Sequence, residues 1–301
     1  MKKNCYICRK KTNQEVVNKK IRGDKKCKVL KCLSCKLQYL DEKFVKKFLT
    51  EKFYRKEYVK LYDKKFFKNK NNHYAKIFEK IGSFTKNKKV LEIGAGGGYL
   101  YHYLKTNVKK YEAVELSDVQ RKYLKKKFKI KTYKEIYQAP KGFYDVVIIV
   151  SVLEHVTDPV GFLRSLKPLL TKRGKIIIEC PSINDPLVSL YHVQSYKDFY
   201  YRAVHLNYFN QSHLKKIIQR SGMKVLKSFS VLVYSLTNHL RWIYNNERST
   251  SSNDATNIFF KNIKMKKLIK NIFKKMNTFY FRELSKSRYS DMEIMICEKK
   301  K

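Results

Sequence analysis

Four cysteines near the start of the chain have the spacing of a metal site. They form two Cys-x-x-Cys pairs, Cys5 with Cys8 and Cys32 with Cys35, and 23 residues separate the pairs. Two such pairs can offer four thiolates to one tetrahedral zinc ion, which would then be structural because no position stays open for water or substrate. Disulfides would require export, and residues 1–10 have no apolar signal core, so we expect reduced thiols in a cytoplasmic protein.

A glycine-rich segment in the first third of the chain has the pattern of a ligand-binding turn. It follows the apolar run 90–93, and its glycines are Gly94, Gly96, Gly97 and Gly98. An apolar run that stops at such glycines predicts a buried strand and a tight turn, where the missing Cβ lets the backbone approach a ligand. A dinucleotide fingerprint would need a third spaced glycine where this chain has Tyr99. We therefore expect a different nucleotide-like cofactor.

A second strand-like run over 111–115 ends at Glu115. This acid follows the first glycine by roughly 20 residues, the distance at which one βα unit brings a carboxylate to a ribose diol. An exposed glutamate is more often only solvated. The conjunction of the acid with the glycine turn favours a cofactor site.

Three later segments extend the pattern in a fixed order. The run 143–156 contains the string Val-Leu-Glu-His at 152–155, the run 174–181 is a second buried strand, and His-x-x-Tyr-Phe stands at 205–209. Together with the glycine turn, they resemble the class I S-adenosylmethionine-dependent methyltransferases. The last segment is similar to small-molecule and sugar methyltransferases of this group. The resemblance implies an α/β fold with a Rossmann-like, doubly wound, seven-stranded and mostly parallel sheet, whose last strand over 291–297 is antiparallel.

The resemblance also implies roles in binding S-adenosylmethionine. Glu92 would lie near the ammonium group of the methionine moiety, the glycines beside that moiety, and Glu115 at the ribose. Glu135, after the third strand, is a candidate for the adenine. The complete set implied for the cofactor is Glu92, Gly94, Ala95, Gly96, Gly98, Glu115, Leu116, Glu135 and Val152.

Two histidines and a tyrosine are the candidates for catalysis. If the acceptor is a sugar hydroxyl or a carbon, a base must take a proton, and the unperturbed pKa of histidine lies nearest to neutral pH. The resemblance places His155 beside the transferable methyl group. His205 is a second candidate, with Tyr208 as its hydrogen-bond partner. Alternatively, a histidine after a strand only caps the neighbouring helix.

The net charge points to two kinds of partner without choosing one. The chain has 68 basic and 25 acidic residues, a formal charge of +43, and 43% hydrophobic residues. Such an excess suggests nucleic acid or an anionic surface as a partner. However, it is mostly lysine spread along the whole chain, which favours compositional drift over specific RNA binding. In either case, polyanions should bind nonspecifically, and this binding should weaken with salt.

Composition divides the chain into segments. We expect a zinc-ribbon module over 1–40, a helical connector over 41–86 and the methyltransferase domain over 87–301, with a helical insertion over 235–290. Within the insertion, residues 261–280 form a basic amphipathic helix. Packing of its apolar stripe on the core is the favoured interpretation, and docking on an anionic membrane is the alternative.

Two acceptor classes follow from the sequence. The favoured one is a small molecule, a nucleotide-linked sugar or glycan precursor, because that is what the zinc module and the His-x-x-Tyr-Phe segment resemble. The rival is a guanine base of rRNA, for which the zinc module and the basic surface would bind RNA. Neither an Asn-Pro-Pro-Tyr nor a Pro-Cys string follows the strand over 143–150, which argues against adenine and cytosine carbon-5 methylation. A non-catalytic binding protein is disfavoured because the glycines and Glu115 are intact.

Overall fold

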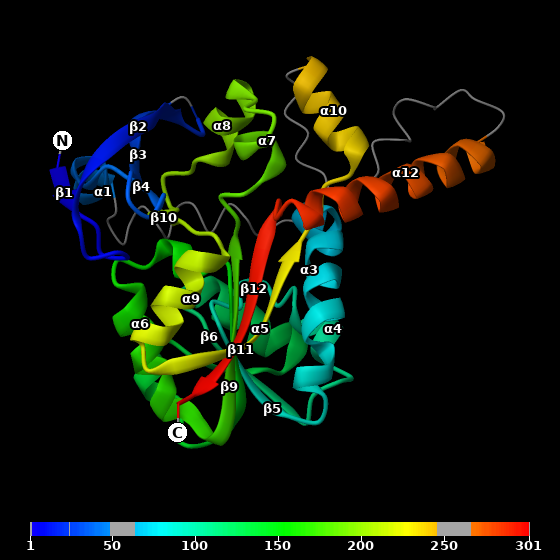
Figure 1. Ribbon diagram of the computed structural model, residues 1–301. Coiled ribbons are helices and arrows are strands. Elements are labelled where there is room, and N and C mark those ends of the chain that lie inside the picture. The colour runs from blue at the N-terminus through cyan, green and yellow to red at the C-terminus, as the bar shows by residue number, and fades with distance from the viewer. Residues whose placement is uncertain (1, 24, 49–63, 246–265, 301) are drawn as a thin grey trace.

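A computed structural model describes residues 2–23, 25–48, 64–245 and 266–300. A large sheet flanked by helices occupies the centre, and a smaller sheet from the N-terminus lies beside one end of it (Figure 1). Further helices lie above the large sheet, and one of them, α12, extends away from it.

The large sheet has seven strands, and only β12 runs antiparallel to the others. This confirms the predicted fold class, including the reversed last strand. From edge to edge the strands are β11 (Met223–Val231), β12 (Met292–Lys299), β9 (Leu170–Pro181), β8 (Tyr144–Val150), β5 (Lys89–Ile93), β6 (Lys110–Val114) and β7 (Lys131–Tyr133).

Helices cover both faces of this sheet, as a doubly wound fold requires. The side chains of β8 alternate between two cores, because Val147 and Ile149 join one apolar cluster while Val146 and Ile148 join the other. The first face carries α6 (Pro159–Leu166) and α9 (Gln211–Arg220), and the second carries α3 (Lys64–Thr85), α4 (Tyr101–Leu104) and α5 (Asp118–Phe128).

Capping residues in the sequence determine where several helices begin. The Asp158 side chain accepts a bond from the Gly161 N–H, and Pro159 occupies the first turn of α6. Ser117 caps α5 in the same way, directly after β6. Three short 3₁₀ turns complete the connections: η1 (Ile136–Gln138), η2 (Leu153–His155) and η3 (Lys167–Leu169).

The small sheet is antiparallel and contains one strand from a distant part of the chain. Its strands in order are β1 (Lys2–Asn4), β2 (Lys11–Ile21), β3 (Lys25–Cys32), β4 (Gln38–Leu40) and β10 (Asn207–Tyr208). The sequence did not predict β10, which comes from the His-x-x-Tyr-Phe segment. Because β10 pairs with β4, that segment joins the N-terminal sheet to the large one.

Helices of the connector and the insertion complete the fold. The connector contributes α1 (Glu42–Phe48) and α3, and residues 49–63 lie outside the described part of the chain. Above the carboxyl ends of the central strands lie α7 (Pro186–Ser189), α8 (Gln194–Tyr200), α10 (Leu236–Asn245) and α12 (Lys266–Lys286).

The expectation that the apolar stripe of α12 packs on the core is wrong for two of its members. Ile272 is 46% exposed and Met276 is 43% exposed, whereas Leu284, further along the same helix, is buried. The helix extends beyond the edge of the sheet (Figure 1). Residues 261–265 of the predicted amphipathic segment lie outside the described residues. No helix within the described ranges is both long and apolar enough to span a membrane.

Candidate functional site

The glycine turn after β5 has a conformation that other residues tolerate poorly. Gly94, Gly96 and Gly98 have φ angles of +73°, +53° and +75°. A Cβ on Gly94 would lie 2.8 Å from Val152 Cγ2, and one on Gly98 would lie 2.9 Å from Leu124 Cδ2. The turn is therefore packed through its glycines against Val152, which follows β8, and against α5; the sequence pattern had predicted the tight turn itself.

Glu115 is fixed beside this turn by backbone hydrogen bonds. Its Oε2 accepts a bond of 2.8 Å from the Gly96 N–H, and its Oε1 accepts one of 2.9 Å from the Ser117 N–H. Burial raises the pKa of the carboxyl group, while these bonds and the nearby Arg121 favour its charged form. The carboxylate is thus held in one orientation at the end of β6, where each oxygen retains a further lone pair.

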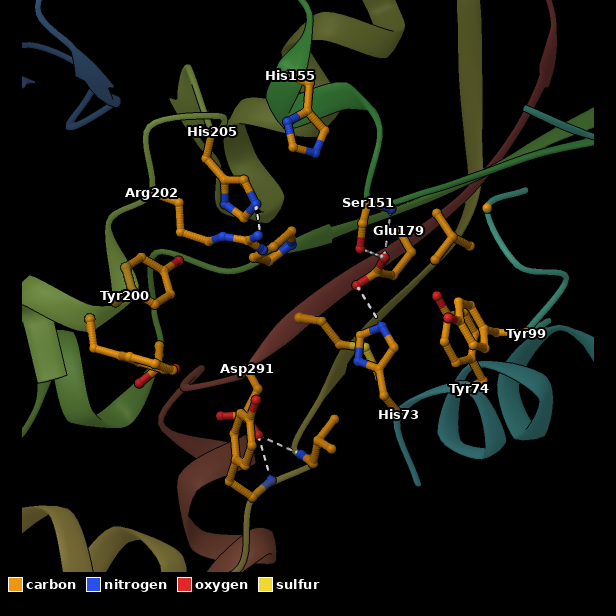
Figure 2. A pocket seen from close by; sticks show the side chains of 18 of the residues that line it. His73, Tyr74, Tyr99, Ser151, His155, Glu179, Tyr200, Arg202, His205 and Asp291 are labelled. Atoms are coloured by element: carbon orange, nitrogen blue, oxygen red, sulfur yellow. Dashed lines mark hydrogen bonds and ion pairs between the residues drawn. The ribbon is translucent and has the colours of Figure 1, made fainter. Parts of the chain in front are cut away.

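A cavity of about 490 Å³ begins at the glycine turn and continues over the carboxyl ends of β8 and β9 and the amino end of the antiparallel β12. Figure 2 shows His73, Tyr74 and Tyr99 on one side of it, Tyr200, Arg202 and His205 on the other, and Asp291 at a third edge. Both the N-terminal sheet and the large domain contribute to the cavity lining, which includes Arg22, His73, Tyr74, Gly94, Ala95, Gly96, Tyr99, Ser151, His155, Glu179, Asp185, Arg202, His205 and Asp291.

The side of the cavity next to the glycine turn combines aromatic rings with a buried acid. Tyr74 of α3 stacks on Tyr99, with ring centroids 5.4 Å apart and planes at 22°. Glu179, at the end of β9, is fully buried, and its Oε2 accepts bonds of 3.0 and 3.1 Å from the N–H and the hydroxyl of Ser151. Its Oε1 lies 3.7 Å from His73 Nε2. Ser151 has a φ of +52°, a strained conformation for a residue with a side chain.

The rings of His155 and His205, which both line the cavity, contact each other edge to face. Their ring centroids are 4.9 Å apart, at an interplanar angle of 79°. His155 Nδ1 lies 2.5 Å from the Val204 carbonyl oxygen, so this nitrogen carries the proton and Nε2 carries the lone pair in the neutral ring. Burial lowers the pKa of His155 to about 4, and the ring is therefore neutral at pH 7.

Glu154 approaches both rings, since its Oε1 lies 3.9 Å from His155 Nε2 and 4.0 Å from His205 Nε2. The ligand atoms of these three residues lie within 4.8 Å of one another, a set that could hold a cation. The guanidinium of Arg202 lies 3.5 Å from His205 Nε2, however, and its positive charge opposes a second cation there.

Two buried acids lie at the far end of the cavity. Asp291 Oδ2 accepts hydrogen bonds from the backbone N–H groups of Val233 and Tyr234, and burial raises the pKa of Asp291 to about 7. Asp185 accepts a bond of 2.8 Å from the Tyr196 hydroxyl, and burial together with the nearby Asp291 raises its pKa. A group with a pKa near neutrality can exchange a proton with an acceptor.

Five of the predicted site residues line the cavity: Gly94, Ala95, Gly96, His155 and His205. Three others do not line the cavity but lie in or beside the glycine turn. Gly98 packs against Leu124, Val152 lies against Gly94, and the Glu115 carboxylate accepts a hydrogen bond from the Gly96 N–H.

The other four predicted residues do not line the cavity. Glu92 is buried in β5, where it accepts a hydrogen bond from the Tyr111 hydroxyl and burial raises its pKa to about 8. Leu116 is 66% exposed, and Glu135 caps η1. Tyr208 is buried beneath the cavity wall, and its hydroxyl accepts a bond of 2.8 Å from the Arg202 N–H.

Sequence reasoning missed Arg22, His73, Glu179, Arg202 and Asp291, which all line the cavity. Glu179 carried a usable signal, because an acid inside the apolar run Ile-Ile-Ile-Glu-Cys must be buried with a partner. Arg22 and Arg202 carried no such signal, because each is one basic residue among many in this sequence.

The four N-terminal cysteines converge on one point. Their sulfur atoms lie within 4.8 Å of one another, with Cys5 Sγ 3.5 Å from Cys35 Sγ and Cys8 Sγ 3.8 Å from Cys32 Sγ. A tetrahedral zinc with Zn–S bonds of about 2.3 Å separates its sulfurs by about 3.8 Å. The donor set and its spacing therefore fit a zinc ion.

Comparison with known proteins places the chain in a family. Residues 64–228, more than half of the chain, match the family described as Methyltransferase domain. The fold is similar to that of a SAM-dependent methyltransferase from Archaeoglobus fulgidus, with a TM-score of 0.51, 17% identity and coverage of 79% of this chain and 100% of that one. A SAM-dependent methyltransferase from Thermotoga maritima gives a TM-score of 0.50 at 14% identity, over 81% of this chain and 95% of that one.

A curated relative is similar at low identity. It is a tRNA U34 carboxymethyltransferase from Trichodesmium erythraeum, 26% identical over 181 residues, which are 54% of this chain and 53% of that protein. The chain thus spans about half the length of this relative. From the fold, the glycine turn and the family match, the chain belongs to the methyltransferase-domain family, whose class I members bind S-adenosylmethionine.

Proposed function

We propose that this chain transfers a methyl group from S-adenosylmethionine to a small polar acceptor, and that the acceptor is a nucleotide-linked sugar or glycan precursor. The cavity is the observation that carries the proposal, because it begins at the glycine turn and ends among charged and aromatic side chains. Its volume of about 490 Å³ falls within the range of small-molecule sites, about 300–1,000 Å³.

The residues at the start of the cavity fit the cofactor. When bound, S-adenosylmethionine supplies a methyl group that its sulfonium already activates. The chain's task is then to hold donor and acceptor in line, and positioning of this kind contributes several kcal/mol. The turn at 94–96 offers a backbone without side chains in the way, and Glu115 offers a fixed carboxylate for the ribose diol.

A hydroxyl or carbon acceptor also has to lose a proton, and His155 Nε2 is the atom that we assign to accept it. The bond from Nδ1 to the Val204 carbonyl fixes the tautomer that leaves Nε2 as the acceptor. His205 would orient the acceptor, and Tyr208 would hold the Arg202 segment through the bond to its hydroxyl. Asp291 is a second proton acceptor within the same cavity, since its pKa is about 7.

An RNA base, a guanine of rRNA in particular, is the alternative acceptor. Two observations favour it: the formal charge of +43, and the similarity to an enzyme whose substrate is tRNA. An RNA base would have to leave its stack to enter a cavity of this kind.

The test offers S-adenosylmethionine with a labelled methyl group to a nucleotide-sugar pool and, separately, to total RNA. Salt of about 0.2 M suppresses nonspecific binding of RNA to the basic surface. We expect label in a small phosphorylated molecule and none above background in RNA. Label in RNA alone would overturn the proposed acceptor class while keeping the enzyme class. The Gly94→Val variant, whose turn cannot keep its shape, is the inactive control.

We also propose that Cys5, Cys8, Cys32 and Cys35 hold one structural zinc ion. The site would fix the two cysteine turns against α9, where His213 Nε2 lies 2.7 Å from the Cys35 carbonyl and Arg220 Nη1 lies 3.3 Å from the Ile7 carbonyl.

We expect about one zinc per chain by metal analysis. Cys32→Ser should lose the metal and lower the melting temperature, whereas Cys27→Ser, which changes a buried cysteine of the same sheet, should retain it. Metal-free wild-type protein with freely alkylated cysteines would contradict the assignment.

We further propose an anionic membrane surface as a partner of the 261–280 segment. The exposed Ile272 and Met276 support this proposal, because an amphipathic helix binds such a surface through apolar side chains among basic ones. Sedimentation with phosphatidylserine vesicles tests it, and Ile272→Ser with Met276→Ser should lower the bound fraction. An unchanged bound fraction in this double variant would contradict the proposal, because the binding would then reflect only the general attraction of a basic protein to an anionic surface.

A further inference from the structure

The N-terminal sheet contributes a charged side chain to the cavity. Arg22 follows β2 at the tip of the β2–β3 hairpin, and its backbone N–H donates a bond of 2.8 Å to the Tyr201 carbonyl. Its Nε donates a bond of 2.6 Å to the Phe199 carbonyl, and its guanidinium lies 3.6 Å from the centroid of the Phe199 ring. These contacts fix the guanidinium through Nε and one face, and its two terminal nitrogens remain available to the cavity.

A second arginine lines the same cavity from another segment. Arg202 belongs to the connection between α8 and β10, and its backbone is held by the Tyr208 hydroxyl. Its Nη1 lies 3.5 Å from His205 Nε2 (Figure 2). Both arginines are half-buried, and both line the cavity.

The two guanidinium groups repel each other. Burial, followed by the charge of Arg202, lowers the pKa of Arg22 to about 10, so Arg22 remains protonated at pH 7. In the described part of the chain, no ion pair joins either arginine to a carboxylate. The acids of the cavity are bonded elsewhere, Asp185 to the Tyr196 hydroxyl and Asp291 to backbone N–H groups. A half-buried pair of like charges is costly unless an anion binds between them.

We propose that Arg22 and Arg202 bind an anionic oxygen group of the acceptor, either a phosphoryl group or a carboxylate. The guanidinium fork matches the geometry of both groups. This inference rests on the proposed function, since it concerns the acceptor of the same cavity. It also gives the N-terminal sheet a role in recognition, because Arg22 reaches the acceptor from the sheet that carries the cysteine cluster.

The test measures binding of small anions to the full-length protein by calorimetry, with S-adenosylhomocysteine present. Pyrophosphate is the probe for a phosphoryl group, and malonate is the probe for a carboxylate. We expect at least one probe to bind, and we expect Arg22→Gln and Arg202→Gln each to weaken that binding at least tenfold, a threshold of about 1.4 kcal/mol. Arg22→Lys keeps the positive charge but lacks the forked guanidinium, so its affinity for the probe should lie between those of the wild type and Arg22→Gln. Arg173→Gln, an exposed position near the start of β9, is the matched control for loss of one positive charge.

The affinity for S-adenosylhomocysteine, measured on the same samples, separates the possible failures. If the wild type binds S-adenosylhomocysteine but neither probe, or if both glutamine variants bind the probes as tightly as Arg173→Gln, the anion site is wrong and the cofactor site stands. If the wild type does not bind S-adenosylhomocysteine, the proposed function itself fails. Melting temperatures identify a variant that has lost its fold, and Arg202→Gln then tests the proposal in place of Arg22→Gln.

Discussion

The two ends of the cavity are built in different ways. The cofactor end comes from one stretch, residues 89–120, in which β5, the glycine turn, β6 and the cap of α5 follow one another. The proposed acceptor end gathers Arg22, Arg202 and Asp291 from segments that only the tertiary fold brings together. The first end is encoded in one contiguous stretch, whereas the second depends on the tertiary fold. Substitutions should therefore separate cofactor binding from acceptor recognition.

The largest effect is expected at the glycine turn. Gly94→Val should abolish detectable binding of S-adenosylhomocysteine, because a Cβ there would meet Val152 Cγ2 at 2.8 Å and the φ of +73° disfavours any side chain. Gly142→Val is the matched control, since Gly142 has a φ of +64° and a Cβ there would have nothing within 4 Å. Calorimetry should show normal affinity for the control. Equal loss in both variants would mean that strain, and not the packing of the turn, explains the effect.

The next effect concerns the acceptor end alone. His155→Ala should lower the rate of methyl transfer about a hundredfold, because the proton acceptor is lost. The affinity for S-adenosylhomocysteine should not change. His102→Ala, at an exposed position of α4, should keep the wild-type rate. A wild-type rate in His155→Ala would make this histidine a structural residue and leave Asp291 as the base.

A smaller effect is expected at the cofactor carboxylate. Glu115→Ala should weaken S-adenosylhomocysteine binding by about 1.5–3 kcal/mol, because a charge-assisted pair of hydrogen bonds is lost. Asp118→Ala removes an exposed charge three residues further along and should bind normally. Unchanged affinity in Glu115→Ala would show that a different residue holds the ribose.

The last effect is a pH dependence of stability that arises from a buried histidine of α10. Burial lowers the pKa of His239 in α10 to about 3, well below the value of about 6.5 in an unfolded chain. The buried neutral ring therefore contributes stability above pH 6.5, and that contribution is lost as the pH falls toward 3, since the unfolded state binds the proton first.

In urea unfolding between pH 6.5 and 4, His239→Gln should lose less stability than the wild type, by up to about 1.4 kcal/mol per pH unit. His102→Gln is the exposed control. Parallel curves for His239→Gln and the wild type would show that the ring is not buried in its neutral form.

The difference between the two ends of the cavity also explains which features could be predicted from the sequence. The main strands of the large sheet and the glycine turn were predicted because apolar periodicity and glycine spacing report on local structure, whereas the reversal of β12 followed only from the resemblance to class I methyltransferases. Glu115 was predicted from local spacing as well, since one βα unit fixes its distance from the turn. The pairing of β10 with β4, and the arrival of Arg22 beside Arg202, depend on long-range docking that no spacing encodes. The exposed Ile272 and Met276 were mistaken for core because amphipathic periodicity does not show what covers an apolar stripe.

The central claim is that the glycine turn and Glu115 hold the adenosyl group while the reacting end of the donor faces the two histidines. A crystal structure with S-adenosylhomocysteine tests it most directly. We predict the ribose hydroxyls on Glu115 and the sulfur in the cavity, between the turn at 94–96 and His155. A ligand bound outside that cavity, or with its ribose away from Glu115, would contradict it.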